Sequence, residues 1–537
     1  MVFFFIIERM KNKFYITTPI YYPSAKLHIG HAYSTTVTDV LARFKRLKGV
    51  PTYFLTGTDE HGQKIQETAE KNEKTPQAFV DEVVLGIKEL WKRMHISYDD
   101  FIRTTEPRHE RVVQTIFSQL LKQNDIYLSK YEGWYCTFCE SFWTNTQVGE
   151  AKVCPDCQRP VHPEAEDAYF FRMSKYADRL VEFYDKNPNF ITPESRKNEM
   201  LNTFIKPGLE DLCVSRTSFT WGVQVKEDPR HVVYVWLDAL TNYITALGYD
   251  SDNPEKFHTF WEDEQSEIVH IVGSDITRFH VIYWPIFLMA LGLRLPDRVV
   301  AHGLLMMKDG KMSKSKGNVI DPLPIIDTYG ADTLRYYIVR ETIFGSDGQF
   351  TPEQFIERTN IDLVNDYGNL LNRTLNMVKK YRDGVVPSYQ KNMSPFDTQL
   401  EQTLQQTLSQ FETLMDQLKV TEAYMVVNQL VSRANKYIDE SRPWVLAKDP
   451  INEQQLNTVL HHLVDVLVVA TSLYSPILVE SAPKAYQQLG LSKAPSFDDL
   501  SNRHLVDGLI NQPPVPLFPR LDPAIEISNI QGMIVKK

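Results

Sequence analysis

The chain has 537 residues, of which 43% are hydrophobic and 23% are charged, a composition typical of globular proteins. Its 23 glycines and 30 prolines exclude a collagen-like or low-complexity chain, and only five cysteines exclude a disulfide scaffold. The net charge of −10 argues against a basic nucleic-acid coat protein, although a local basic patch can still bind nucleic acid. The apolar run at 281–293 is shorter than the roughly 18 residues that cross a bilayer, so no membrane segment is expected.

The first residues predict no targeting signal. Residues 1–12 begin with a short apolar run and continue with charged residues, without the basic start and the cleavage site of a signal peptide. We therefore expect a frayed extension at this end and a cytoplasmic protein.

Strand and helix patterns alternate in the first part of the chain. Residues 13–20 are typical of a buried strand, 28–48 of a helix and 52–57 of a second strand. This alternation predicts a parallel sheet with crossover helices. Residues 119–233 interrupt the rhythm with irregular polar stretches and paired cysteines.

The first pattern then resumes. We expect strands at 232–236, 267–273 and 298–302, with a helix at 276–292. The simplest architecture is an α/β domain that is split in two by an insertion.

The last third of the chain is predicted to be helical. Apolar residues spaced three and four apart indicate helices at 353–382, 397–441 and 454–478. Together they predict a helix bundle. The tail beyond 512 is proline-rich and is expected to pack as a strap.

The first motif that can carry chemistry is His28-Ile29-Gly30-His31, at the start of a predicted helix. A helix N-terminus presents N–H groups that suit phosphate, and histidines one turn apart can donate hydrogen bonds to it. Gly30 leaves room for a flat base beside the backbone. The same residues also fit an ordinary helix start with two incidental histidines.

The second motif is the KMSKS segment at 311–315. Residues 308–316 carry a local charge of +3 in an acidic chain, and glycines stand at 310 and 317. Lysines on a glycine-flanked loop can close over a polyphosphate and neutralise charge in the transition state. A solvated basic loop is the alternative.

Two CxxC pairs form the third motif. Fourteen residues separate Cys136 and Cys139 from Cys154 and Cys157, a pattern typical of a tetrahedral zinc site. Because four thiolates close the coordination shell, we expect one structural Zn2+ that folds the insertion and does no chemistry. Cys213 is expected to be a buried, inert thiol.

Aromatic residues suggest two further sites. Trp236 and Tyr243 fit a pocket for an apolar, sulfur-bearing side chain, although periodicity alone favours core positions for both. Asn369 and Arg373 lie one helical turn apart, and Trp444 follows. A polar pair and a stacking ring can read unpaired bases, although a surface pair and a buried tryptophan are the commoner explanation.

The histidine and lysine motifs lie about 280 residues apart and together resemble the two signatures of the class I aminoacyl-tRNA synthetases. Within that class, the chain is similar to the methionyl-tRNA synthetases from about residue 13 to 510. Six segments carry the resemblance: ITTPIYYPSAKLHIGHAYS, LTGTDEHGQKI, the CxxC pairs, YVWLDAL, RFHVIYWP and HGLLMMKDGKMSKSKGN.

The resemblance implies a set of site residues. Those implied for catalysis are His28, His31, Lys311 and Lys314. Those implied for ATP are His28, Gly30, His31, Gly273, Asp275 and Lys314. Those implied for methionine are Ile20, Tyr22, Asp59, Trp236, Leu240, Tyr243 and His280, with Asp59 receiving the ammonium group. The anticodon would be read by Asn369, Arg373 and Trp444. Ser274 stands where the family usually has a lysine.

The resemblance also implies the reaction, the partners and the fold. Methionine and ATP, with Mg2+, would form methionyl-adenylate, and the methionyl group would pass to the 3′-terminal ribose of tRNA(Met) in a monomeric enzyme. The expected fold class is α/β, a Rossmann-like parallel-sheet catalytic domain split by a zinc-knuckle insertion and followed by an all-α helix-bundle domain. The expected parts are an extension (1–12), the first catalytic half (13–118), the insertion (119–233), the second catalytic half with the KMSKS loop (234–352), an anticodon-binding domain (353–511) and a strap (512–537).

Other functions explain less of the chain. The isoleucine, valine and leucine synthetases share the signatures but carry a large editing insertion, and the cysteine enzyme holds zinc in its substrate pocket. A non-catalytic RNA-binding paralogue should have lost a signature residue, and all four are present. Another adenylyl-transferring enzyme would not need the insertion and the helical domain, and a zinc ribbon explains only some twenty residues.

Overall fold

The computed structural model describes residues 11–139, 141–143, 145–307, 310–311, 319–341, 345–389, 391–501, 509–510 and 513–535. The expected N-terminal extension therefore lies largely outside the described residues. The chain divides into two compact units. The first comprises the described parts of Met1–Lys26, Pro51–Glu89 and Tyr98–His302, and the second those of Leu27–Val50, Leu90–Ser97 and Gly303–Lys537.

A six-stranded parallel sheet forms the centre of the first unit, in the order β3-β2-β1-β11-β12-β7. Its strands are β1 (Lys13–Tyr21), β2 (Thr52–Thr58), β3 (Asp100–Arg103), β7 (Ile191–Thr192), β11 (Ser266–Gly273) and β12 (Arg298–His302). Phe14, Tyr15 and Ile16 are fully buried, as expected for a parallel strand that is covered on both faces. The predicted Rossmann-like sheet is confirmed.

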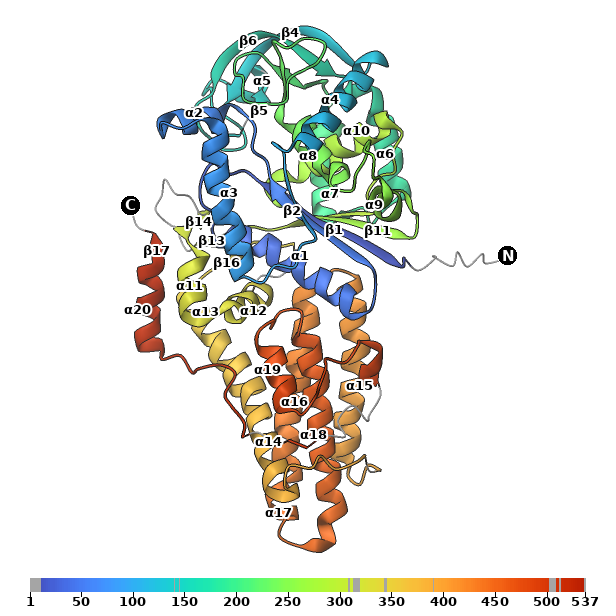
Figure 1. Ribbon diagram of the computed structural model, residues 1–537, viewed down its shortest axis with the longest axis vertical. Helices are drawn as coiled ribbons and strands as arrows, with labels where there is room; N and C mark the ends of the chain where they lie inside the picture. The colour runs from blue at the N-terminus through green and yellow to red at the C-terminus, as the bar shows by residue number, and fades with distance from the viewer. Residues whose placement is uncertain are drawn as a thin grey trace, which may run out of the picture. The chain divides into compact units, whose positions relative to one another are not determined.

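The order of the strands reverses at β1. From β1, the chain order runs outward through β2 and β3 on one side and through β11 and β12 on the other (Figure 1). In open α/β sheets, ligands bind outside the carboxyl ends of the strands at this switch point. Residues that follow β1, β2 and β11 therefore lie where a ligand-binding site is expected.

The insertion is more regular than its sequence suggests. Strands β4 (Ile126–Cys136) and β6 (His162–Phe171) form a long antiparallel pair, flanked by β5 (Ser141–Trp143) and β8 (Leu212–Cys213). Along β6, half-buried and exposed residues alternate before the strand enters the core. Because so little of this pair is buried, its sequence lacks the apolar alternation that would have predicted it.

Two predicted elements of the first unit differ from the structure. The strand expected at 232–236 is only β10 (Val232–Val233), and helix α8 (Val235–Thr245) begins before Trp236. The helix expected at 276–292 is divided into η4 (Ser274–Ile276), the π-turn η5 (Phe279–Tyr283) and α10 (Trp284–Leu291). Such π-turns often mark functional sites. Further helices are α2 (Gln63–Lys71), α3 (Pro76–Arg93), α4 (Pro107–Lys122), α5 (Asn145–Val148), α6 (Ala177–Lys186), α7 (Glu194–Met200) and α9 (Glu255–Phe257).

The second unit contains the helix bundle. Its helices are α1 (Ile29–Leu47), α11 (Pro322–Tyr329), α12 (Ala331–Glu341), α13 (Pro352–Arg358), α14 (Asn369–Arg382), α15 (Pro395–Asp416), α16 (Val420–Ser441), α17 (Pro443–Leu446), α18 (Glu453–Tyr474), α19 (Ser481–Gln488) and α20 (Pro523–Met533). The single helix expected at 397–441 is two helices, α15 and α16. Leu418 adopts a left-handed backbone conformation between them, with φ of 61°, and this turn lets the two helices pack on each other.

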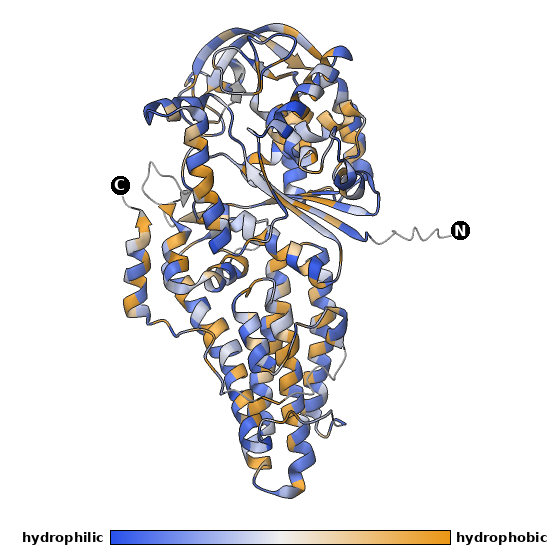
Figure 2. Cartoon of the chain, viewed as in Figure 1, coloured by the Kyte–Doolittle hydropathy of each residue, from blue (hydrophilic) through white to orange (hydrophobic). Residues whose placement is uncertain are grey.

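Helix α18 is the apolar centre of the bundle. Within the helical stretch Pro450–Tyr474, an 18-residue window has a mean hydropathy of 1.5, high enough for a membrane span, but 94% of that window is buried inside the protein. Among the described residues, no other helix passes that test of length and hydropathy. Figure 2 shows hydrophobic and hydrophilic residues interspersed along the surrounding helices. Burial by its neighbours therefore explains the hydropathy of α18.

A buried ion pair fixes helix α1 within the second unit. The guanidinium of Arg335, on α12, donates to the carboxylate of Asp39 at 2.6 Å, and both side chains are fully buried. Arg335 also donates to the carbonyls of Met94 and Ile477. Burial alone would raise the pKa of Asp39, but Arg335 and Arg43 hold that pKa below its ordinary value. The pair therefore joins distant parts of this unit.

The C-terminal residues contain more structure than a strap. Helix α20 is followed by β17 (Ile534–Val535), which pairs antiparallel with β15 (Val319–Ile320). The hydroxyl of Tyr329 donates to the carboxylate of Glu526 at 2.6 Å. The remaining short strands are β9 (Ser215–Arg216), β13 (Leu305–Met307), β14 (Gly310–Lys311) and β16 (Gly348–Gln349).

Candidate active site and cysteine knuckle

The carboxyl ends of β1 and β2 bring the first predicted site residues together. Ile20 lies opposite Gly57 in the register of the two strands, and Asp59 directly follows β2. The N–H of Asp59 donates to the carbonyl of Tyr21 at 3.0 Å. The side chain of Asp59 is buried, so a carboxylate stands at the switch point of the sheet, where it could receive a cationic group.

The residue after Asp59 fixes the backbone of this segment. Glu60 is fully buried and accepts two hydrogen bonds from Arg103, at 2.7 and 2.8 Å. It also accepts hydrogen bonds from the hydroxyls of Thr58 and Thr105, at 2.5 and 2.6 Å. With its carboxylate satisfied in this way, Glu60 has a structural role and holds Asp59 in place.

Two histidines share the carboxylate of Asp238, on helix α8. Nδ1 of His61 donates to one oxygen at 2.7 Å and Nε2 of His109 to the other at 2.8 Å, and all three residues are buried. Burial alone would raise the pKa of Asp238, but His61 and His109 lower that pKa to about 2. Although burial opposes it, Asp238 raises the pKa of His61. The segment after β2 is thereby tied to α8.

Helix α8 also carries three of the seven residues of the predicted methionine pocket. Leu240 and Tyr243 are buried in the main apolar cluster of the first unit, and Ile20 and Trp236 pack against the same cluster. Tyr22 differs, because it packs against a separate cluster around Ile65. The structure thus brings Ile20, Trp236, Leu240 and Tyr243 to one apolar region.

Tyr243 and His280 form a buried polar contact within that region. The tyrosine hydroxyl lies 2.7 Å from Nε2 of His280, and Nδ1 of the same ring lies 3.0 Å from the carbonyl of Ile276. Since a carbonyl can only accept, Nδ1 carries the proton and Nε2 accepts from the tyrosine. Burial lowers the pKa of His280 to about 4. The pocket therefore has a neutral polar contact, which suits an uncharged side chain.

Aromatic rings complete this region. The rings of Trp236 and Phe279 are stacked, with centroids 3.4 Å apart and planes inclined by 13°. Gly273 ends β11, and Asp275 lies exposed in the turn that follows. A Cβ at Gly273 would lie 2.6 Å from a carboxylate oxygen of Asp275, so a side chain here would displace that exposed carboxylate.

In the second unit, the predicted histidine motif caps helix α1. Nδ1 of His28 accepts from the N–H of Gly30 at 3.1 Å, and Nδ1 of His31 accepts from the N–H of His28 at 3.0 Å. In the neutral ring, Nε2 then carries the proton and can donate. A Cβ on Gly30 would lie 2.9 Å from the ring of His28, so glycine lets that ring fold over the first turn. The motif offers donors where a helix N-terminus favours an anion.

The second signature is described only in part. Gly310 and Lys311 form strand β14, which pairs with β13, so that Met306 lies opposite Lys311. Lys314 lies outside the described residues.

The four cysteines of the CxxC pairs meet at the end of strand β4. Their sulfur atoms all lie within 4.8 Å of one another, with 3.6 Å between Cys136 and Cys157 and 4.0 Å between Cys139 and Cys154. None of the four forms a disulfide. Tetrahedral zinc with Zn–S bonds of about 2.3 Å requires sulfur separations of roughly 3.8 Å. The cluster therefore fits a structural zinc ion.

The fifth cysteine is separate from this cluster. Cys213 is buried, and its thiol donates to the carbonyl of Ser215 at 3.2 Å. Burial raises the pKa of the Cys213 thiol to about 12, as expected for an inert side chain.

The residues predicted to read the anticodon lie in the second unit. Asn369 and Arg373 lie on α14, and Arg373 donates to the carboxylate of Asp439 at 3.0 Å. Trp444 lies on α17 and is 43% exposed. The commoner expectation, a buried tryptophan, does not apply to Trp444, whose exposed ring could stack on a base.

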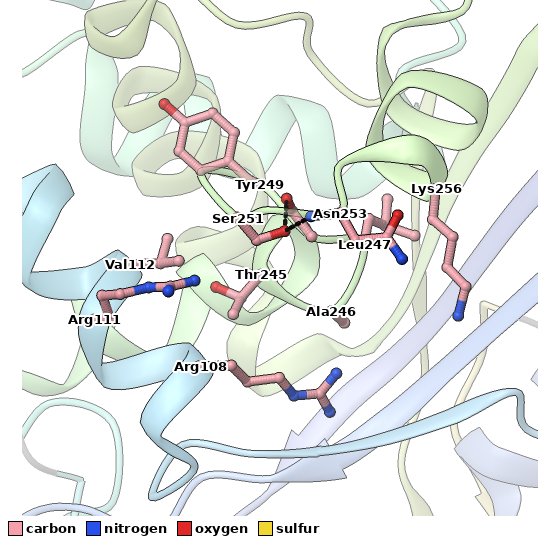
Figure 3. Close-up of a pocket in the computed structure, with 11 residues that line it drawn as sticks. Arg108, Arg111, Val112, Thr245, Ala246, Leu247, Tyr249, Ser251, Asn253 and Lys256 are labelled. Atoms are coloured by element: carbon pink, nitrogen blue, oxygen red, sulfur yellow. Dashed lines mark hydrogen bonds between the residues drawn. The ribbon is translucent and has the colours of Figure 1, made fainter.

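A cavity of about 230 Å³ lies apart from the predicted pocket (Figure 3). Its basic lining residues contact the amino ends of the strands: Arg108 pairs with Asp100 of β3, and Lys256 donates to Tyr53 of β2. Ser251 donates to the carbonyl of Gly248 and closes the loop beside it. The cavity thus lies at the opposite ends of the strands from Asp59.

Sequence reasoning missed several residues that organise the site. His61, His109 and Asp238 form one buried group, and Phe279 stacks on Trp236. Two of the three buried residues stand inside quoted segments, His61 in LTGTDEHGQKI and Asp238 in YVWLDAL. The sequence did show that these polar residues stand beside apolar segments, which could have marked them as buried. It could not show that they contact one another, because they are distant in the sequence.

Comparisons with known proteins agree with this geometry. The family described as "tRNA synthetases class I (M)" matches residues 14–162 and 159–375, so the chain is a class I tRNA synthetase in its fold and family. A second family, "Anticodon binding domain of methionyl tRNA ligase", matches residues 386–522. The chain belongs to the methionyl family of class I tRNA synthetases.

Individual relatives cover nearly the whole chain. The methionine–tRNA ligase of Halalkalibacterium halodurans is 55% identical over 98% of this chain and 81% of its own length, and that of Bacillus subtilis is 53% identical over 97% and 80%. Among solved structures, Mycobacterium tuberculosis methionyl-tRNA synthetase in complex with methionyl-adenylate aligns with a TM-score of 0.90. It shares 39% identity, and the alignment covers 95% of this chain and all of the other.

Proposed function

We propose that this chain activates methionine with ATP and transfers the methionyl group to tRNA(Met). The match of both family models and of full-length relatives carries this proposal. The pocket supports it from the residues upward. A buried carboxylate, an apolar region and a neutral tyrosine–histidine contact are what a methionine zwitterion with an uncharged thioether side chain requires.

Each part of the pocket has a proposed role. Asp59 receives the methionine ammonium group as a charge-assisted hydrogen bond acceptor. The thioether side chain is held by Ile20, Tyr22, Trp236, Leu240, Tyr243 and His280. The Tyr243–His280 pair presents no charge to it, so a charged side chain would lose hydration without gaining a partner.

Activation needs no protein nucleophile. A carboxylate oxygen of methionine attacks the α-phosphorus of ATP, the bond to the bridging oxygen breaks, and pyrophosphate leaves. Mg2+ bound with ATP would neutralise part of the phosphate charge. His28, His31, Lys311 and Lys314 stabilise the negative charge that accumulates on the phosphates, and Gly30, Gly273 and Asp275 contact the nucleotide. The capped arrangement of His28 and His31 supports this role, because both rings can donate from Nε2.

Transfer follows on the tRNA. A hydroxyl of the 3′-terminal ribose attacks the carbonyl carbon of the adenylate, the bond to the phosphate oxygen breaks, and AMP leaves while the hydroxyl proton is released. Asn369, Arg373 and Trp444 read the anticodon, with Trp444 stacking on a base.

We further propose one structural Zn2+ per chain, held by Cys136, Cys139, Cys154 and Cys157, in a monomeric cytoplasmic enzyme. The ion would crosslink the two CxxC turns and so stabilise the insertion. The cysteine geometry supports this, since all four sulfur atoms converge.

Amino-acid-dependent ATP–pyrophosphate exchange tests the activation step. The assay uses the zinc-loaded chain with each of the twenty amino acids and no tRNA. We expect exchange with methionine alone. Exchange with a different amino acid would preserve the class and reject the methionine pocket, and no exchange at all would favour a non-catalytic RNA-binding protein.

A further inference from the structure

Arg278 lies between the cysteine knuckle and the predicted methionine pocket, and no role for it follows from the proposed reaction. It directly precedes the π-turn Phe279–Tyr283, and its side chain is only 13% exposed. Its guanidinium carbon lies 4.8–5.9 Å from the ring centroids of four aromatic residues: Trp143, Phe204, Phe279 and Tyr283. Arg278 is therefore a cation held mainly by aromatic faces.

The charge partner of Arg278 belongs to the knuckle. Its guanidinium lies 3.8 Å from the carboxylate of Asp156, which stands between Cys154 and Cys157. Within the described part of the chain, this is the only ion pair of Arg278. A cation with so little water around it gains more from aromatic faces than an exposed one, so displacing it should be costly.

Arg278 also contacts an aromatic residue that packs on the predicted methionine pocket. Phe279, whose ring lies 4.8 Å from the guanidinium, stacks on Trp236 at 3.4 Å. Trp236 and Phe279 also line a cavity of about 280 Å³ together with Trp143 and Arg278. A continuous set of contacts thus runs from Asp156 through Arg278 and Phe279 to Trp236.

A second contact leads from the knuckle to a different residue proposed to bind methionine. The ring of Phe138, beside Cys139, lies 3.2 Å from the guanidinium of Arg159 and 4.4 Å from Nζ of Lys64. The same Nζ lies 5.2 Å from the ring of Tyr22, another residue proposed to bind methionine. Each CxxC pair of the knuckle therefore encloses a residue, Phe138 or Asp156, that contacts a cation. Lys64 also contacts Tyr22, and Arg278 also contacts Phe279.

From these contacts we infer that Arg278 is a positioning residue that couples the cysteine knuckle to methionine binding, through the Phe279–Trp236 stack. The inference rests on the proposed function, because it takes Trp236 as a methionine contact. When the knuckle is ordered by its metal, Asp156 is held in place and orients Arg278. Phe279 then supports the ring of Trp236 in the position that binds the substrate side chain.

The first test compares Arg278→Met with Arg278→Lys in the full-length, zinc-loaded protein. Arg278→Met keeps a long side chain but removes the charge, and we expect the Kd for methionine, measured by calorimetry, to rise about tenfold. Arg278→Lys restores a cation and should recover part of the affinity. Arg230→Met, at a side chain 77% exposed and ion-paired with nearby Asp228, is the matched control and should bind like the wild type.

Three readouts separate positioning from a general structural defect. Zinc content and melting temperature should stay near the wild-type values. In pyrophosphate exchange the KM for methionine should rise, and the KM for ATP should not. A methionine Kd for Arg278→Met within twofold of wild type would overturn the inference, as would loss of zinc or equal changes in both KM values. If the wild type itself fails to bind methionine, the proposed function fails, not the coupling alone.

A double-mutant cycle tests the route through Asp156. Asp156→Asn leaves the four thiols in place and removes the charge partner, and we expect it to raise the methionine Kd about threefold. Combined with Arg278→Met it should add nothing further, because both changes interrupt one set of contacts. If the double variant instead raises the methionine Kd by the product of the two separate factors, the residues act independently. That result would contradict the proposed route from Asp156 through Arg278.

Linkage supplies the last measurement. If knuckle and pocket are coupled, saturating methionine must strengthen zinc binding, because coupling between two ligands is reciprocal. We expect the zinc affinity of the wild type, measured by competition with a chelator, to rise with methionine, and that gain to shrink in Arg278→Met. The same zinc affinity with and without methionine in the wild type would overturn the inference.

Discussion

The hydroxyl of Tyr243 donates a 2.7 Å hydrogen bond to Nε2 of His280, and both residues are buried. The direction of this bond is set by the backbone, because Nδ1 of His280 must donate to the carbonyl of Ile276. The π-turn that carries His280 thus determines which atom faces Tyr243. A neutral, hydrogen-bonded pair within the proposed methionine pocket is the result.

Removing the hydroxyl of Tyr243 should therefore weaken methionine binding. Tyr243→Phe leaves Nε2 of His280 buried without a donor, a loss worth about 1–3 kcal/mol. We expect the methionine KM in pyrophosphate exchange to rise about tenfold, with the ATP KM unchanged. Tyr249→Phe is the matched control, since within the described residues its hydroxyl makes no hydrogen bond. An unchanged methionine KM in Tyr243→Phe would reject the role of this pair.

The burial of His280 predicts a pH dependence of stability. Its pKa in the folded protein is about 4, whereas an unfolded histidine titrates near 6.5, at about its reference value. Between these values the unfolded chain binds the proton more readily, so stability falls as pH decreases from about 6.5 toward 4. At its largest, this loss in the free energy of unfolding amounts to about 3 kcal/mol. There is no such loss above about pH 6.5.

His280→Gln should flatten this dependence while keeping a polar side chain of similar reach. The measurement is the apparent melting temperature of both proteins between about pH 7.5 and pH 5. The pKa of His61 is raised, but this residue is present in both proteins, so its contribution to the pH dependence cancels in the comparison. Parallel pH curves would show that His280 does not contribute.

Asp238 should be among the most important single side chains for the stability of the first unit. In Asp238→Asn, His61 and His109 lose their shared carboxylate, and breaking a buried charge pair of this kind costs about 3–5 kcal/mol. We expect a lower melting temperature and a weaker affinity for methionine, because α8 is no longer tied to the segment after β2. Asp252→Asn, at an exposed position, should change neither.

The cysteine knuckle can be tested against the remaining cysteine. Cys154→Ser removes one of four converging thiols, so we expect the bound zinc to fall well below one ion per chain and the insertion to become sensitive to protease. Cys213→Ala removes a buried thiol outside the cluster and should retain full zinc. The two variants are compared by zinc release on thiol modification. Equal zinc content in both would reject the four-cysteine site.

Trp444 should affect the tRNA step alone. Stacking of a base on an aromatic ring is worth about 1–3 kcal/mol, so Trp444→Ala should raise the KM for tRNA roughly tenfold or more. Methionine-dependent pyrophosphate exchange, which needs no tRNA, should not change. Val445→Ala is the neighbouring control, at a side chain that is 47% exposed. Loss of exchange in Trp444→Ala would point to a folding defect instead.

Much of this protein could be predicted from short stretches of sequence. Strands β1, β2, β11 and β12 were predicted because their sequences are mostly apolar, as burial on both faces requires, whereas the short strands β3 and β7 were not predicted. The residues of each CxxC pair and of the histidine motif lie within a few positions of one another in the sequence. Their spacing alone therefore indicates their chemistry. The boundary between α15 and α16, in contrast, depends on the left-handed backbone conformation of one residue, Leu418, and it was not predicted.

The tertiary structure decided which of these residues meet. His61 and Asp238 are 177 residues apart and share one hydrogen bond, and Arg278 contacts Asp156 from a different part of the first unit. No local pattern distinguishes such partners from other polar residues, because their pairing depends on how the strands and helices pack. The sequence by itself determined the family, four strands of the sheet and the four-cysteine cluster, since each is encoded by neighbouring residues. Only the packed fold decided the protonation of His280, the support of Trp236 and the position of Arg278, since burial and distant partners set all three.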